Sequence, residues 1–319
     1  LMGSSQMREP FLMALVTVSV WGFVRWRYQS VRWGLGWLAL GLGGLLLVSP
    51  SVAAFTLVWL AGWLWLRREH TVLTWRALGA AAVIALAALA LFAVGVSRDF
   101  SLGSLRFSAV WDWFVQAARW DMVQGTRQSG WVQKLMEQMP EWMEMPFVLV
   151  YGLAQPVLPA ALIEPALPIW QGLGVARALG WYALLPFLVF GTLSLLWRPE
   201  TGRRLWVWMA AMGWLWIVIA ALRAGGDQWD NPRYRVIFLL IQAMLFAYAW
   251  QGRGSAWFGR VLAMEGVFLF FFGQWYISRY WAVPGQLPFA VMVALIVLCW
   301  GVIVAGGLVW DARRKRRPA

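Results

Sequence analysis

The residues best suited to chemistry lie in a polar segment at 225–235, with the sequence GGDQWDNPRYR. Its acids, arginines and tyrosine could bind a ligand: Asp227, Asp230, Arg233, Tyr234 and Arg235. The Gly-Gly and Asn-Pro pairs favour a shaped turn over a helix. Arginine side chains at this density match an anionic ligand such as a phosphate. The alternative is that Asp230 and Arg233 pair with each other at the edge of a membrane.

A second polar segment, GSSQMREP at 3–10, directly precedes an apolar run. Here Arg8 could bind a phosphate and Glu9 could act as an acid or base. The simpler explanation is that an acid before Pro10 stabilises the start of a helix. The single histidine, His70, argues against Ser-His-Asp chemistry and most zinc sites. The single cysteine, Cys299, leaves no internal disulfide, and we predict no metal-binding residues.

The composition indicates that a membrane must position these residues. Of the 319 residues, 61% are hydrophobic and 13% are charged, which leaves too few charges to cover a soluble domain. The apolar runs are long and continuous, and they lack the alternation of barrel strands. The sequence therefore predicts an all-α, polytopic transmembrane helix bundle with about nine spans.

The predicted spans fall into two groups on either side of a long polar segment. The first group is 10–24, 33–48, 52–66 and 77–96, and the second is 179–197, 205–222, 236–250, 261–277 and 287–310. The chain then divides into N-terminal helices at 1–96, an outer loop at 97–176, C-terminal helices at 177–310 and a basic tail at 311–319.

The outer loop has a helical pattern of its own. Apolar residues recur at helical spacing at 111–122 and 131–139, which predicts helices lying along the membrane surface. The proline-rich stretch at 146–168 makes a poor spanning helix and predicts a re-entrant or cavity-lining segment.

The arginines predict the orientation of the bundle. They concentrate in the loops that hold Arg25, Arg67, Arg198 and Arg253 and in the tail at 313–317. Because cytoplasmic loops are rich in Lys and Arg, the C-terminus is expected in the cytoplasm and both polar segments on the outer face. Topology and anionic lipid then explain the net charge of +13 without nucleic acid. The expected location is the inner (plasma) membrane of a bacterium.

Three features in the same order resemble the GT-C superfamily of membrane glycosyltransferases, the class of protein O-mannosyltransferases and lipid A aminoarabinose transferases. The segment SQMREP at 5–10 resembles that class's second outer loop, where an arginine and an acid precede an apolar helix. The outer segment continues into YGLAQPVLP at 151–159, a proline-rich stretch. The segment NPRYR at 231–235 resembles the Arg-Tyr entry to a late helix in that class.

The resemblance implies transfer of a sugar from a polyprenyl-phosphate donor to a glycan, lipid or protein acceptor at the outer face. A carboxylate would deprotonate the acceptor hydroxyl, and Arg8, Arg233 and Arg235 would hold the leaving phosphate. Tyr234 would line the site. Either acid of the 225–235 segment, Asp227 or Asp230, would orient an arginine or help to bind a divalent cation.

The resemblance also implies that sequence upstream of Leu1 is missing. That class keeps its principal catalytic acid in a first outer loop, and about three further spans would be needed to reach it. Glu9 stands where the class commonly has Asp, so it offers only a secondary acid.

Three other functions stay open. An O-antigen polymerase or ligase also uses lipid carriers, but those ligases use a loop histidine, and His70 falls on the cytoplasmic side. A transporter or lipid flippase is expected to carry charge at mid-membrane and broken helices in matched halves. Here Glu265 is expected to reach Arg260 or the lipid headgroups instead. The third alternative is a scaffold that packs with other membrane proteins.

Overall fold

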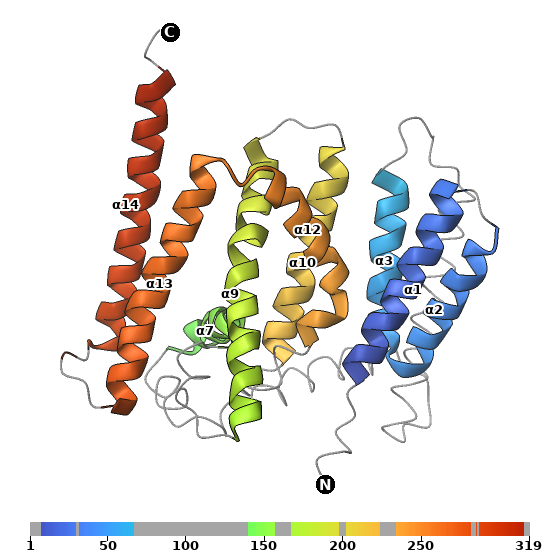
Figure 1. The fold of residues 1–319 in the computed structure, drawn as a ribbon, viewed down its shortest axis with the longest axis horizontal. Helices are drawn as coiled ribbons and strands as arrows, with labels where there is room; N and C mark the ends of the chain where they lie inside the picture. Colours follow the sequence, from blue (N-terminus) through green and yellow to red (C-terminus); the bar gives the residue numbers. More distant parts are fainter. Residues whose placement is uncertain are drawn as a thin grey trace. The chain divides into compact units, whose positions relative to one another are not determined.

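The computed structural model describes residues 8–29, 32–66, 140–156, 167–197, 202–223, 234–281, 285 and 287–315. Every regular element in these ranges is helical (Figure 1), as the sequence predicts. In chain order they are α1 (Arg8–Gln29), α2 (Gly34–Val48), α3 (Pro50–Leu66), α7 (Glu141–Ala154), α9 (Pro168–Trp197), α10 (Arg203–Arg223), the 3-10 helix η2 (Val236–Phe238), α12 (Leu239–Gln251), α13 (Ala256–Trp281) and α14 (Phe289–Lys315). The predicted span 77–96 and both predicted surface helices lie outside the described residues.

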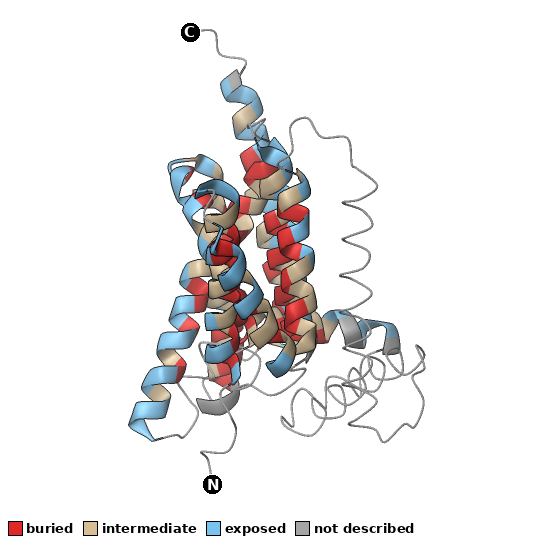
Figure 2. Ribbon diagram, turned by 90° about the vertical axis from the view of Figure 1, so that its right-hand side faces the viewer, coloured by how far each residue is buried: buried red, intermediate tan, exposed pale blue. Residues whose placement is uncertain are grey.

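Four of the described helices, α9, α10, α13 and α14, are long and apolar enough to cross a membrane. Each of them contains or closely overlaps one predicted span. The helices α2 and α3 are also apolar, but at 15 and 17 residues they are shorter than the roughly 20 residues of a perpendicular span. α14 buries few of its residues, and the turns near its C-terminal end are mostly pale blue or tan in Figure 2. Such a surface fits contact with lipid.

The helices form two compact units that do not follow the order of the chain. Unit 1 is Leu1–Leu153 with Thr201–Ile241, and unit 2 is Ala154–Glu200 with Gln242–Ala319. α10 and η2 therefore belong with α1, α2 and α3, although they lie in the C-terminal half of the sequence.

α1 and α2 form a hairpin in which the two backbones touch, and they lie side by side in Figure 1. A methyl group added at Gly22 or at Gly34 would lie 2.5 Å from a backbone nitrogen of the other helix. One added at Gly41 would collide with the hydroxyl of Ser19. Small residues at helix crossings permit this close approach, which is typical of membrane helices.

An aromatic cluster holds η2 against α3 and α10 in unit 1. Phe238 of η2 lies 4.7 Å from Phe55 and 4.6 Å from Trp216, measured between ring centroids. Trp59 extends the cluster, with its ring centroid 6.1 Å from that of Phe238. Its Nε1 also donates to the sulfur of Met209 at 2.9 Å, which joins α3 to α10. Aromatic pairs at these separations stabilise beyond their buried area, so the cluster fixes where the chain enters α12.

In unit 2 aromatic side chains join α9 to α13. Phe258, near the start of α13, lies 4.7 Å from Phe187 and 5.4 Å from Phe190 between ring centroids. Further along α13, Phe268 lies 6.4 Å from Tyr182. The α9 residues fall in number as the α13 residues rise, so the two helices are antiparallel.

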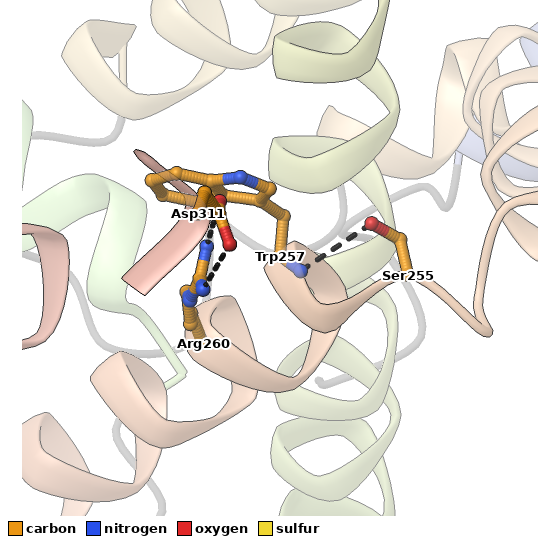
Figure 3. A network of polar contacts seen from close by, with 4 residues as sticks. All are labelled: Ser255, Trp257, Arg260 and Asp311. Carbon is orange, nitrogen blue, oxygen red and sulfur yellow. Dashed lines mark hydrogen bonds and ion pairs between the residues drawn. The ribbon is translucent and has the colours of Figure 1, made fainter. Parts of the chain in front are cut away.

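An ion pair ties the start of α13 to the end of α14 (Figure 3). The two terminal nitrogens of Arg260 donate to the two carboxylate oxygens of Asp311, at 2.7 Å and 2.8 Å. The guanidinium also lies 4.4 Å from the ring centre of Trp257, a cation–π contact. The expectation that Glu265 reaches Arg260 is therefore wrong. Residues five apart on a helix point to different sides, whereas Asp311 approaches from the neighbouring helix.

Removing the acid of this pair should loosen α13 from α14. In Asp311→Asn the bidentate, charge-assisted bonds are lost, and we expect a loss of about 1 kcal/mol in the free energy of unfolding. Thermal unfolding in detergent measures it. Arg313→Gln, an exposed position on the same helix, is the control and should unfold at the wild-type midpoint. Equal unfolding midpoints for the wild type, Asp311→Asn and Arg313→Gln would show that the ion pair between Arg260 and Asp311 does not stabilise the protein.

Candidate functional site

One end of unit 1 holds the described residues of the two polar segments, 8–10 and 234–235. The chain runs up α1, back along α2 and up again along α3, so α1 and α3 begin at the same end (Figure 1). Phe55, near the start of α3, contacts Phe238 of η2 at 4.7 Å. Trp216, two thirds of the way along α10, donates from its Nε1 to the carbonyl oxygen of Tyr234 at 2.9 Å. The chain that leaves the 225–235 segment therefore lies at the end where α1 begins, and α1 packs against η2.

Arg235 is the most unusual residue at this end, because its side chain is only 3% exposed. Its Nη1 donates to the carbonyl oxygen of Leu153, in the last turn of α7, at 3.4 Å. The neighbouring Gly152 packs closely on α10, since a methyl group there would lie 2.8 Å from the carbonyl oxygen of Ala221. Burying a guanidinium is costly unless hydrogen bonds compensate. An arginine buried beside apolar helices is therefore a functional-site candidate.

Glu9 is the second buried charged residue of this end, with 4% of its surface exposed. It belongs to the buried side of α1, together with Leu12 and Val16. It also lies in the first turn, where a carboxylate is favoured by the helix dipole. Arg8, beside it, is exposed. The two residues of the predicted pair thus occupy different environments.

The structure brings three of the predicted site residues, Glu9, Tyr234 and Arg235, to one end of unit 1. Tyr234 is half-buried there. The other three residues of the 225–235 segment lie outside the described residues: Asp227, Asp230 and Arg233. Their roles stay predictions. Among the residues that the structure describes, no cluster of His, Cys, Asp or Glu could hold a metal ion.

Sequence reasoning missed the contribution of α7. The stretch at 146–168 was expected to be a re-entrant or cavity-lining segment, with no contact named for it, and its backbone carbonyl at Leu153 accepts a bond from Arg235. Tyr151 is buried and stacks on Phe147 at 5.9 Å between ring centroids. Gly152 was the available signal, because a glycine within an apolar helix often marks a close approach to a neighbouring backbone.

The arrangement has two chemical capacities. A buried arginine offers several N–H donors in a fixed plane, which suits the oxygens of a phosphate ester. A carboxylate at the same end can accept a proton from a hydroxyl group. Together they suit a reaction in which an anionic leaving group departs while a hydroxyl attacks.

No protein family, curated protein sequence or solved structure matches this chain. The resemblance to the GT-C superfamily therefore has only its three sequence features behind it. The function must be inferred from the residues and their placement.

Proposed function

We propose that this protein is a membrane glycosyltransferase that moves a sugar from a polyprenyl-phosphate donor to an acceptor at the outer membrane face. The observation that carries the proposal is the buried Arg235 at the end of unit 1 where α1 begins with the buried Glu9. The four long apolar helices support the membrane setting. Within it, we propose about nine spans with the C-terminus in the cytoplasm of a bacterial cell.

In the proposed reaction, the acceptor oxygen bonds to the anomeric carbon while the bond from that carbon to the phosphate oxygen breaks. A carboxylate takes the proton of the acceptor hydroxyl, with Glu9 as the secondary acid. Arg235 binds the polyprenyl phosphate as it leaves, assisted by Arg8 and Arg233, and so stabilises the charge that develops there. Asp227 or Asp230 orients an arginine or helps to hold a cation.

The test is sugar transfer by the full-length protein in lipid vesicles. Vesicles receive a panel of radiolabelled polyprenyl-phosphate sugars, with cell-envelope glycan, lipid and protein extracts as acceptors. We expect label to move from at least one donor to an acceptor. Counterflow of the lipid carrier is measured in the same vesicles. Counterflow without transfer would overturn the proposal.

A transporter or lipid flippase is the second candidate, because one observation favours it. Glu265 lies about 13 Å along α13 at ~1.5 Å per residue. It is farther from the start of this helix than from the start of the predicted span 261–277, and ionisable groups inside spans commonly mark ion or substrate pathways. Counterflow that depends on Glu265, in the absence of sugar transfer, would favour this candidate.

A further inference from the structure

Glu265 stands inside a helix that is long and apolar enough to cross a membrane. α13 runs from Ala256 to Trp281, and at ~1.5 Å per residue Glu265 lies about 13 Å from its start. A carboxyl at this depth has to be accommodated within the protein and the lipid.

The carboxyl lies on the side of α13 that packs against α9. Phe258 and Phe268 contact aromatic rings of α9, at 5.4 Å and 6.4 Å between centroids. Val261 belongs to a buried cluster with residues of α9 and α12. Glu265 follows Phe258 by seven residues and Val261 by four, spacings that keep residues on one face of a helix. It therefore points toward α9 rather than toward the lipid.

Among the described residues, no group donates a hydrogen bond to this half-buried carboxyl. Its Oε1 is buried and has no hydrogen-bond partner among the described residues. The antiparallel packing sets it level with residues 182–186 of α9. There the Tyr182 hydroxyl donates to the carbonyl of Ala154 at 2.6 Å, and Pro186 has no N–H to give.

The other titratable groups on the packed helices do not supply a cation either. On α13 itself Arg260 is bound to Asp311 of α14. Arg177 of α9 is exposed, as are Arg313 and Arg314 of α14. Beyond these, α14 contributes Cys299 and α12 contributes Tyr248, neither of which is cationic. Every described cationic side chain on α9, α13 and α14 is thus exposed or already bound to Asp311.

We propose that Glu265 is a proton-binding site between α9 and α13. An ionised carboxylate without donors in an apolar interior carries a large desolvation penalty, whereas the neutral acid does not. The proton-bound form of the carboxyl is therefore favoured over the ionised form within the apolar layer. This inference concerns unit 2 and goes beyond sugar transfer, on which it does not rest.

The test is labelling of the full chain in lipid vesicles with dicyclohexylcarbodiimide, an apolar reagent that adds to protonated carboxyls. The acid proton passes to one reagent nitrogen and the carboxylate oxygen bonds to the central carbon of the reagent, giving an O-acylisourea. The acyl group then shifts from that oxygen to a reagent nitrogen, which breaks the acyl C–O bond, forms a C–N bond and gives a stable N-acylurea without any co-reactant. Peptide mass spectrometry locates the adduct. We expect it on Glu265, with a rate that falls about tenfold per pH unit once the carboxyl begins to ionise. Asp311, ionised beside Arg260, should stay unlabelled.

Glu265→Gln, which keeps the size and removes the acid, should lose the adduct completely while unfolding at the wild-type temperature. The wild-type result stands by itself if that variant fails to fold. Two outcomes would overturn the proposal. One is a folded wild-type chain that stays unlabelled at Glu265. The other is protection of Glu265 by sodium or potassium, but not by choline, at constant pH, because a metal cation would then be the occupant.

Discussion

Replacing Gly22 by alanine is expected to lower the free energy of unfolding by about 3 kcal/mol. The added methyl would lie 2.5 Å from the backbone nitrogen of Leu38 and 2.7 Å from the carbonyl oxygen of Gly34. Both atoms belong to the backbone of α2, so no side-chain rotation can make room. The two helices must separate, and the close contacts along the whole crossing are lost with them.

The hairpin supplies its own controls for this prediction. Gly36 and Gly43 are also in α2, but a methyl at either one would meet no described atom within 4 Å. Alanine there should be neutral or slightly stabilising, because alanine favours helix more than glycine does. Thermal and denaturant unfolding in detergent, followed by tryptophan fluorescence, compares the three variants. Equal midpoints for Gly22→Ala and Gly36→Ala would show that the backbones do not touch.

Arg235→Lys is expected to reduce sugar transfer by about 100-fold. Lysine keeps the positive charge but lacks the planar set of donors that a guanidinium presents to a phosphate and to the Leu153 carbonyl. Because the charge is conserved, we expect the protein to stay folded at the assay temperature, with a midpoint of thermal unfolding close to that of the wild type. The measurement is initial transfer rate in vesicles, normalised to folded protein by gel filtration.

The matched control is Arg204→Lys, an exposed arginine on α10 in the same unit. It makes the same chemical change away from the site and should transfer at the wild-type rate. An Arg235→Lys protein that transfers sugar as fast as this control would remove Arg235 from the site. If the wild-type protein transfers no sugar from any donor, the proposed function itself fails, whatever the variants do.

The helices were predictable from the sequence because long apolar runs leave few alternatives. The predicted span 287–310 lies almost entirely within α14 (Phe289–Lys315), and the span 205–222 lies within α10 (Arg203–Arg223). The start of α9 was less visible. Its first turns hold glycines and an arginine among the apolar residues, and the helix begins at Pro168, a residue well suited to the first position.

Contacts between distant residues could not be predicted in the same way. Periodicity indicates which side of a helix a residue occupies, but it does not name the neighbouring helix. The bond from Arg235 to Leu153 joins residues 82 apart in sequence, and the pair of Arg260 with Asp311 joins residues 51 apart. Both depend on how helices pack. The predicted contact of Glu265 with Arg260 was wrong for the same reason, since that arginine has a partner on another helix.

The contact between α1 and α2 has a consequence for how this protein can evolve. Because backbone meets backbone, the selective constraint falls on Gly22, Gly34, Gly41 and Ser19. Exposed positions such as Leu35 and Leu40 need only stay apolar. Descendants of this chain can therefore substitute most of the exposed residues of the hairpin and still fold. What they inherit in common is the spacing of a few small residues.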